Sequence, residues 1–303
     1  MAESAPCDIK SRGFIPMKEP GLYSVRIHVV GGFMRSDWLA EVSRLAEKYG
    51  RGHVHLTTRQ GVEIPYVPQE NIYALQDELA ESGLRVGGCG PRVRTMTACQ
   101  GLGCRHGLID AQGIAQRLMI RVEHRVLPHK FKVCIAGCPN ACPKPVENDF
   151  GVQGVIQKTF HREECKACGL CVKVCPSVGA LRIEDKSLAL CEESCIGCGK
   201  CIQACPFGAL ESERTLYQVS LGGKMGRFPK PAYQLPFLLP SESAVGQVLD
   251  ATLDWYCENG RSKERFGDAL ERIGVEFLIP ILAPVAKQES PAYQCTGPMR
   301  CSP

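Results

Sequence analysis

The feature that most constrains this 303-residue chain is a cysteine spacing that occurs twice. The pattern C-x2-C-x2-C-x3-C-P is formed first by Cys165, Cys168, Cys171 and Cys175, and again by Cys195, Cys198, Cys201 and Cys205. Three closely spaced thiolates wrap three corners of a [4Fe–4S] cubane, and in this spacing the fourth thiolate comes from the other repeat. We therefore expect one cluster on Cys165, Cys168, Cys171 and Cys205, and a second on Cys195, Cys198, Cys201 and Cys175.

This double repeat is the cysteine run of bacterial two-cluster ferredoxins. Zinc is the competing interpretation of clustered cysteines, but a zinc site does not require two intact repeats that each end in proline. Gly169, Gly197 and Gly199 let backbone amides turn toward the cluster sulfides. Residues 161–212 form a cysteine-dense island, and we predict that they make an inserted 2[4Fe–4S] ferredoxin domain.

The chain contains 19 cysteines, which raises the question of its compartment. Its first ten residues hold no apolar run of signal-peptide length, and no stretch reaches the ~18 apolar residues that span a bilayer. A disulfide scaffold of secreted type is therefore disfavoured, and we expect a cytoplasmic protein whose reduced thiols bind metal. The net charge of +4 gives no support for nucleic-acid binding.

A second cysteine set lies upstream of the island. Cys99 and Cys104 form one pair, Cys138 and Cys142 form another, and a predicted helix separates the pairs. Two such pairs can hold one further [4Fe–4S] cluster. Cys134 lies nearby and is an alternative ligand to Cys99. Between Arg85 and Lys132 there are nine Lys and Arg residues against two acids, so we expect this stretch to face an anionic ligand.

The apolar periodicity predicts a mixed α+β chain, with antiparallel sheets covered by helices. Ser36 is expected to cap a helix that ends at Tyr49, and the proline-rich residues 229–240 are expected to form a linker. The further expected elements are strands at 23–30, 53–58 and 62–67, and helices at 72–79, 108–122, 245–257 and 263–270. The expected domains are residues 1–83, 84–160, 161–212 and 213–303, the last continuing the second.

At several motifs the chain resembles the sirohaem-containing nitrite and sulfite reductase family. Leu56-Thr57-Thr58-Arg59-Gln60 is similar to the family's Thr-Thr-Arg-Gln motif, and Lys130-Phe131-Lys132 to its basic strand. Gly137-Cys138-Pro139-Asn140-Ala141-Cys142 is similar to the second cysteine pair, whereas Cys99 and Cys104 are one residue closer than the family's first pair. The layout, a single half-length unit with an inserted ferredoxin, resembles the C subunits of anaerobic sulfite reductase.

The resemblance implies a sirohaem and three [4Fe–4S] clusters per chain. Cys99, Cys104, Cys138 and Cys142 would hold the cluster next to the haem, and Cys142 would bridge the two. The substrate and proton-delivery set implied by the resemblance is Arg26, Arg59, Lys130 and Lys132. Residues implied to contact the cofactor are Thr58, Gln60 and Asn140, with Arg92, Arg94 and Arg105 as candidates for its carboxylates on charge and position.

The activity implied is reduction of sulfite, a small oxyanion, to sulfide, with electrons relayed through the ferredoxin clusters. Nitrite reduction to ammonia, a non-catalytic electron-transfer subunit and a sirohaem assembly or sensor protein are the alternatives. No Gly-x-Gly-x-x-Gly motif in a strand–helix setting points to a nicotinamide or flavin. We therefore expect a partner subunit or a soluble ferredoxin as electron donor. Since the chain resembles one half of the full-length enzymes, we expect a homodimer or an assembly with a homologous subunit.

Overall fold

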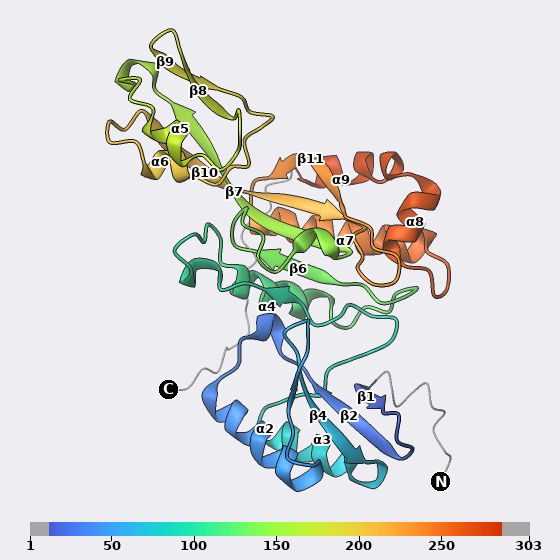
Figure 1. The fold of residues 1–303 in the computed structure, drawn as a ribbon. Helices are drawn as coiled ribbons and strands as arrows, with labels where there is room; N and C mark the ends of the chain where they lie inside the picture. The colour runs from blue at the N-terminus through green and yellow to red at the C-terminus, as the bar shows by residue number, and fades with distance from the viewer. Residues whose placement is uncertain (1–11, 287–303) are drawn as a thin grey trace.

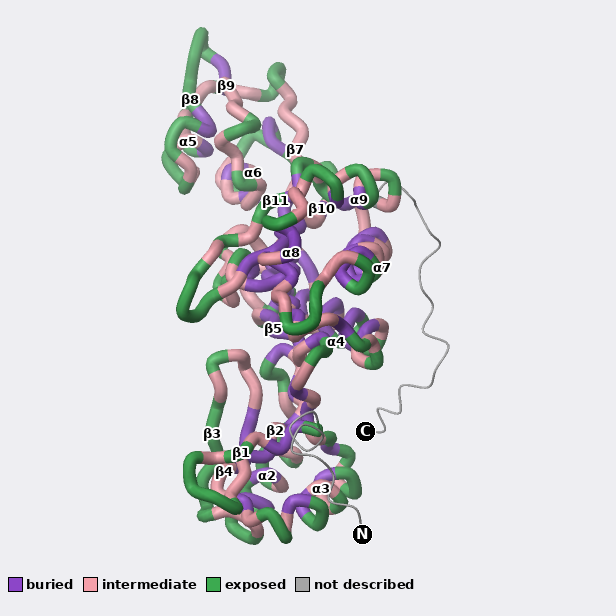
Figure 2. Tube along the Cα trace, turned by 90° about the vertical axis from the view of Figure 1, so that its right-hand side faces the viewer, coloured by how far each residue is buried: buried purple, intermediate pink, exposed green. Residues whose placement is uncertain are grey.

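A computed structural model describes residues 12–286 as three stacked parts, an N-terminal layer, a central body and a protruding lobe (Figure 1). Each part has its own cluster of buried apolar side chains, with members from 14–84, from 93–282 and from 171–210 respectively. The body draws its core from both sides of the lobe in sequence, since Phe131 packs with Tyr256 and Phe266. The tube in Figure 2 shows these buried segments inside each part.

The N-terminal layer is a four-stranded antiparallel sheet in the order β1-β2-β4-β3, and two helices belong to the same layer. Its elements are β1 Phe14–Pro16, β2 Leu22–Ile27, α2 Ser36–Tyr49, β3 His55–Leu56, β4 Val62–Pro68 and α3 Ile72–Glu81. Val42 and Leu45 of α2 and Leu75 and Leu79 of α3 are fully buried, as their helical spacing predicts.

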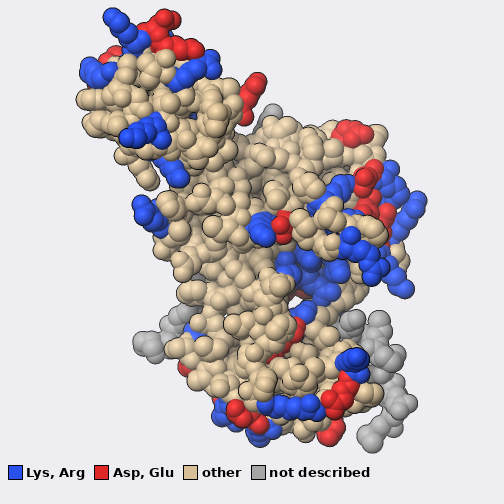
Figure 3. Space-filling model, viewed as in Figure 1, with Lys and Arg blue, Asp and Glu red and all other residues tan. Residues whose placement is uncertain are grey.

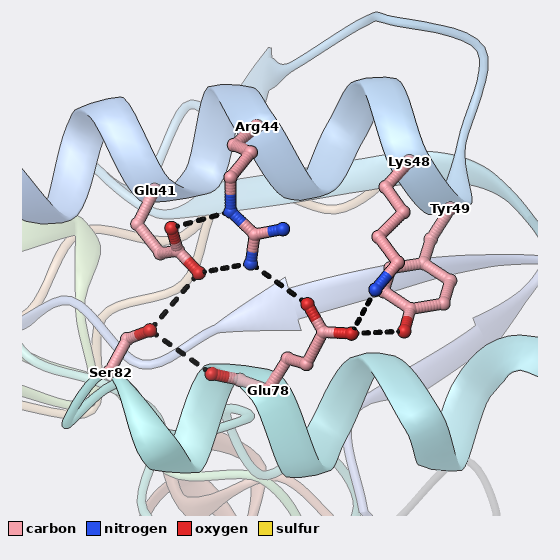
Figure 4. A network of polar contacts seen from close by, with 6 residues as sticks. All are labelled: Glu41, Arg44, Lys48, Tyr49, Glu78 and Ser82. Atoms are coloured by element: carbon pink, nitrogen blue, oxygen red, sulfur yellow. Dashed lines mark hydrogen bonds and ion pairs between the residues drawn. The ribbon is translucent and has the colours of Figure 1, made fainter.

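Polar contacts join the exposed sides of α2 and α3 (Figure 4). Arg44 donates to both Glu41 and Glu78, and Lys48 and Tyr49 also contact the Glu78 carboxylate. These three donors hold the pKa of Glu78 at about 2, with Lys48 the largest influence. The network links the two helices at the surface of the layer.

The prediction that Ser36 caps α2 is wrong. The helix begins at Ser36, and Arg35 occupies the capping position without a side-chain cap. The Asp37 carboxylate instead accepts a hydrogen bond from the Trp38 amide at 3.0 Å and pairs with Arg35. The negative charge in the first turn is favourable there because the amino end of a helix carries partial positive charge.

The central body is a five-stranded sheet in the order β11-β10-β7-β6-β5, packed with four helices. Its elements are β5 Thr97–Ala98, α4 Ala111–Val122, β6 Val133–Ala136, β7 Phe150–Phe160, β10 Leu210–Leu221, β11 Tyr233–Leu239, α7 Glu242–Asn259, α8 Phe266–Ile273 and α9 Ile279–Ala286. The prediction of an α+β chain with antiparallel sheets is confirmed, and the β5–β6 and β6–β7 pairings are parallel.

The prediction of a linker at residues 229–240 is wrong, because this segment contains β11. The strand lies at the edge of the sheet and pairs only with β10 among the described strands. An edge strand tolerates Pro236, since one side of its backbone needs no ladder partner.

The lobe is carried on the long antiparallel pair β7–β10, which runs out of the body (Figure 1). Its own elements are short: α5 Leu170–Val174, β8 Leu181–Glu184, β9 Ser187–Leu190 and α6 Lys200–Gln203. No helix among residues 12–286 is long and apolar enough to cross a membrane. Cys295 and Cys301, for which the sequence suggests no role, lie outside the described residues.

Candidate functional site

The four cysteines of the upstream pairs line one cavity in the body. The parallel strands β5 and β6 end at the same edge of the sheet, Cys99 directly follows β5, and Cys138 comes two residues after β6. The loops beyond these strands bring Cys104 and Cys142 to the same cavity, whose volume is about 660 Å³. Cys142 is exposed and the other three are half-buried, so the set opens outward at Cys142.

Backbone groups hold the two cysteine pairs together. The Gly137 amide donates to Cys99 Sγ at 3.0 Å, which links the end of β6 to the first pair. A side chain at Gly137 would meet Cys99 Sγ at 3.2 Å and Gly101 Cα at 3.0 Å. Glycine is therefore needed for the two loops to approach this closely. An amide aimed at a cysteine sulfur is also a favourable partner for a metal-bound thiolate.

Cys134, the alternative ligand, does not line this cavity. Its side chain is fully buried in β6, and its Sγ donates to the Pro143 carbonyl at 3.1 Å. Burial raises the pKa of this thiol to about 11. Since metal ligation requires the thiolate, these surroundings favour Cys99 over Cys134 as the fourth ligand.

The N-terminal layer closes the cavity from the other side. Gln60 Nε2 donates to the Ala98 carbonyl at 2.7 Å, and the Ala98 amide donates back to Gln60 Oε1 at 2.8 Å. Gln60 itself has a φ of 58°, unusual for a non-glycine residue. Gly32, with φ of 67°, packs where a side chain would meet Gln60 Cβ at 2.9 Å. The turn that carries Gln60 is thus fixed against β5.

The cavity wall suits a large flat ligand. Nine of its residues are glycine or alanine, whose backbone a ring system can approach: Gly31, Gly32, Gly61, Ala98, Gly101, Gly107, Ala136, Gly137 and Ala141. Gln112 also lines it, donating to the Gly31 and Cys99 carbonyls at 2.9 and 3.1 Å. Its Oε1 is buried against Gly31 and has no hydrogen-bond partner within residues 12–286.

A group of cations lies in the hollow between the N-terminal layer and the body (Figure 3). We call it the cation cluster; its members are Arg26, Arg59, Arg94, Lys130, Lys132 and Arg265. Burial, followed by Arg59 and Arg265, lowers the pKa of Lys132 to about 8. Burial also lowers the pKa of Arg59 to about 10. The hollow therefore holds positive charge whose repulsion a small anion would relieve.

Arg59 is held toward this hollow by the body. Its Nη1 donates to Asn148 Oδ1 at 2.7 Å and its Nη2 to the Thr95 carbonyl at 3.2 Å. Its neighbour Gln60 lines the cysteine cavity, whereas Arg59 does not. One turn of the N-terminal layer thus serves both the cavity and the cation cluster.

Two buried residues, Glu63 and Cys89, contact Arg26 and Arg94 of the cation cluster. Arg26 donates to Glu63 Oε1 from Nε at 2.8 Å and from Nη2 at 2.6 Å, and its Nη1 donates to Cys89 Sγ at 3.2 Å. Arg94 also contacts Cys89 and donates to the Gly88 carbonyl. Burial lowers the pKa of Arg94.

The sequence did not identify Arg265 as part of this group. Its Nη2 lies 2.7 and 2.9 Å from the two carboxylate oxygens of Asp149, a fully buried residue. The same carboxylate accepts the Lys132 amide at 2.8 Å. Arg265 lies 116 residues from Asp149 and belongs to no motif, so only the fold joins them.

The other predicted contact residues are dispersed. Asn140 lines the cysteine cavity, and Arg105 is an exposed residue beside Cys104. Thr58 is exposed on the turn before Arg59 and does not line the cavity. Arg92 is exposed beside a different hollow, lined also by Arg12 and Arg85. Cofactor contact therefore stays a prediction for each of them.

The expectation that the whole basic stretch faces an anion needs correction. Four of its nine cations pair with the chain's own carboxylates: Arg85 with Glu123, Arg117 with Glu242, Arg121 with Asp250 and Arg125 with Asp254. The acids lie mainly on α7, far away in sequence, so counting charge along one segment overstated the unpaired charge.

In the lobe, the two cysteine repeats interleave around two small cavities. Cys175, Cys195, Cys198 and Cys201 line the first, and Cys165, Cys168, Cys171 and Cys205 line the second. Within residues 12–286, no three Cys, His, Asp or Glu side chains converge on a point as a single metal ion requires. A cubane needs thiolates around a body of several atoms, which is how the three cysteine sets lie.

Comparisons with known protein families divide the chain in two. Residues 89–287 match the family described as nitrite and sulphite reductase 4Fe-4S domain. Residues 15–82 match the nitrite/sulfite reductase ferredoxin-like half domain. Together these matches cover the cysteine cavity, the cation cluster and the lobe.

Relatives and solved structures point the same way. The chain is 33% identical to an uncharacterized protein of Methanocaldococcus jannaschii over 92% of its length and 97% of that protein. It is 32% identical to the C subunit of the anaerobic sulfite reductase of Salmonella typhimurium, over 77% of this chain and 74% of that protein. It is 31% identical to the coenzyme F420-dependent sulfite reductase of Methanocaldococcus jannaschii, of which it spans only 45%. A crystal structure of dissimilatory sulfite reductase I covers 90% of this chain, and 73% of its own, with a TM-score of 0.71 at 20% identity, a likeness of fold.

Proposed function

The chain belongs to the nitrite and sulphite reductase family, and on that premise we propose that it is a sirohaem-dependent reductase that converts sulfite to sulfide. The observation that carries this proposal is the cavity shared by the two cysteine pairs. Cys99, Cys104, Cys138 and Cys142 would hold a [4Fe–4S] cluster, and Cys142, the exposed member, would face the sirohaem. When bound, these groups supply the electron transfer of a six-electron reduction.

The cavity wall supports the fit of a macrocycle. Its small residues leave room for a ring, and Asn140 offers a polar contact at the wall. Exposed Phe33 and Leu56, also in the wall, offer apolar surface to a ring face. Arg105, an exposed residue beside Cys104, would meet a carboxylate of the cofactor.

The cation cluster would bind the substrate. Arg26, Arg59, Lys130 and Lys132 would draw sulfite in, polarise its S–O bonds and supply protons to departing oxygens. A protein that only relays electrons has no need of such an anion site. This is why we favour a catalytic role over the alternatives of an electron-transfer subunit or an assembly protein.

The cysteine cavity and the cation cluster would meet across two copies of the fold. None of Arg26, Arg59, Lys130 and Lys132 lines the cavity that contains Cys142. A twofold arrangement, with a second copy or a homologous subunit, would place the cation cluster of one protomer over the Cys142 cavity of its partner. The match to a protein named as a subunit supports an assembly of this kind.

The lobe would carry two further [4Fe–4S] clusters and receive electrons from outside the chain. Its two cysteine sets match the ligand exchange of two-cluster ferredoxins. The donor would be a partner subunit or a soluble ferredoxin. The chain spans 45% of the F420-dependent relative, so that protein's use of F420 is not transferred here. A cytoplasmic location remains a prediction.

Sulfite is favoured over nitrite by the extent of similarity. The sulfite reductase relatives match 77% to 91% of this chain. The ferredoxin–nitrite reductase of Zea mays, at 34% identity, matches 48%. Nitrite reduction remains the second candidate because the cysteine pairs belong to a family that includes both activities.

Cofactor analysis of the purified protein, followed by kinetics, tests this proposal. Three clusters and one sirohaem give about thirteen irons per chain, together with a haem-like Soret band and a red absorption band. Reduced dye should be oxidised on addition of sulfite, with sulfide as product and a higher kcat/KM for sulfite than for nitrite. About eight irons without haem absorption would leave an electron carrier and refute the catalytic proposal.

A further inference from the structure

Lys158 is a buried lysine that contacts one of the cysteine sets of the lobe, a contact that the spacing of the cysteines does not predict. It lies on β7, at the base of the lobe, and its side chain is only 5% exposed. Its Nζ donates to Cys195 Sγ at 2.9 Å, and both residues line the cavity of the Cys175, Cys195, Cys198 and Cys201 set. A buried ammonium is costly unless a negative partner offsets its desolvation.

The nearest acceptor for Lys158 is the sulfur of Cys195, which would carry negative charge as a cluster ligand. Glu192 is the other nearby acid, but its carboxylate is 4.0 Å away and its side chain is 74% exposed, so water screens it. The Gly197 amide also points at Cys195 Sγ, at 3.4 Å. Two donors around one sulfur suit a thiolate bound to a cluster.

The two cysteine sets of the lobe differ in whether a cation donates a hydrogen bond to one of their sulfurs. In the hydrogen bonds described for residues 12–286, no lysine or arginine donates to Cys165, Cys168, Cys171 or Cys205. Cys168 is also exposed, whereas Cys198, at the matching place in the other repeat, is half-buried. The charge of Lys158 therefore acts on the set that contains Cys195. The buried surroundings of that set screen the charge only weakly.

The set with Lys158 is the one nearer to the body. The Ile156 amide of β7 donates to the Gly197 carbonyl at 2.8 Å, so this cysteine loop lies against the strand that leaves the body. Figures 1 and 2 both place α6, which follows the loop, on the side of the lobe toward the body, with α5 and β8–β9 farther out.

We infer that Lys158 raises the reduction potential of the cluster held by Cys175, Cys195, Cys198 and Cys201, an inference that rests on the proposed function. One-electron reduction makes a thiolate-ligated cluster more negative. A fixed ammonium that hydrogen-bonds to one of its sulfurs stabilises that reduced form. A raised potential at the inner cluster favours electron transfer from the tip of the lobe toward the body.

A redox titration of the purified holoprotein, followed by electron paramagnetic resonance, tests this inference. Lys158→Met removes the charge but keeps the length of the side chain. We expect the ratio of reduced to oxidised inner cluster, at a fixed solution potential, to fall about tenfold, which is about 59 mV for a one-electron couple. The other cluster signals should titrate as in the wild type.

Three further variants make the result specific. Lys158→Arg keeps the charge and should titrate close to the wild type. Lys173→Met removes an exposed charge from α5 in the same lobe and should change no potential. Glu192→Gln removes the screened acid beside Lys158 and should change the potential of the inner cluster little.

Two failures are distinguishable. Wild-type protein without [4Fe–4S] signals would refute the proposed function itself. A full set of clusters that titrates identically in wild type and Lys158→Met would refute this inference alone. If Lys158→Met does not assemble its clusters, Lys158→Gln, which keeps a hydrogen-bond donor but carries no charge, decides, and a wild-type potential in that variant overturns the inference.

Discussion

At the scale of single residues, Lys132 shows how burial adjusts an acid to its task. Its ammonium is half-buried and close to the guanidinium groups of Arg59 and Arg265. Both effects oppose the charged form, and they lower its pKa to about 8. A lysine with this pKa is mostly protonated near neutral pH, and it gives up its proton more readily than an exposed lysine.

This pKa predicts the pH dependence of sulfite reduction. The protonated form, present below about pH 8, binds the anion and supplies the proton, so kcat/KM should fall as pH rises through about 8. Lys132→Arg should move this fall to higher pH, because a guanidinium stays protonated. Lys132→Ala should lower turnover about 100-fold while cofactor content persists.

Steady-state kinetics across pH 6–10 would measure this, with Lys144→Ala as a control at an exposed lysine close to Cys142. An alkaline fall at the same pH in wild type and Lys132→Arg would show that another group controls it.

At the scale of elements, Asp149 joins three segments beneath the cation cluster. It comes just before β7, accepts the Lys132 amide just before β6, and pairs with Arg265, the residue that precedes α8. Asp149 is 0% exposed and the Arg265 side chain 14% exposed, so this ion pair is largely shielded from solvent. Removing one partner of such a pair leaves a buried charge uncompensated.

We predict that Asp149→Asn lowers the free energy of unfolding by about 3–5 kcal/mol. Asp268→Asn is the matched control, because Asp268 is 42% exposed and pairs with Lys224 at the surface. The control should cost less than about 1 kcal/mol. Denaturant unfolding of both variants at one pH would measure the difference. Equal losses in the two variants would show that the Asp149–Arg265 pair is not an anchor.

The sequence predicted the elements with regular periodicity and missed those set by long-range packing. The helix ending at Tyr49 and the helix with Leu75 and Leu79 on one face follow from apolar spacing. The strand β11 was missed because the four prolines of residues 229–240 suggest a linker until the place of the strand at the sheet edge is known.

In the candidate site too, local spacing predicted some residues and only the fold brought the others together. Local spacing groups the cysteines correctly around their cavities, since each pair or repeat lies within a few residues. It does not identify Arg265, or Lys158 beside Cys195, because both contacts join segments that are distant in sequence. Likewise, the acids of α7 that neutralise the basic stretch lie more than a hundred residues from it.

At the scale of the whole molecule, the chain separates the parts that a reductase must bring together. The lobe stands away from the body on β7 and β10 (Figure 1), and the cation cluster lies outside the cavity lined by Cys142. Within our proposal, a second copy supplies the missing half of each site. Each sirohaem would be ligated through Cys142 of one protomer and faced by Arg59, Lys130 and Lys132 of its partner.

Complementation between two inactive variants tests this account most directly. Cys142→Ala and Lys132→Ala would be purified separately, mixed under conditions of subunit exchange, and assayed for sulfite-dependent sulfide formation. In a homodimer with shared sites, each mixed dimer holds one site with an intact cysteine and an intact lysine. The mixture should then regain about one quarter of wild-type activity, since half of the dimers are mixed and one of their two sites works. No recovery despite demonstrated exchange, or full sulfite reduction by a wild-type monomer, would contradict the account.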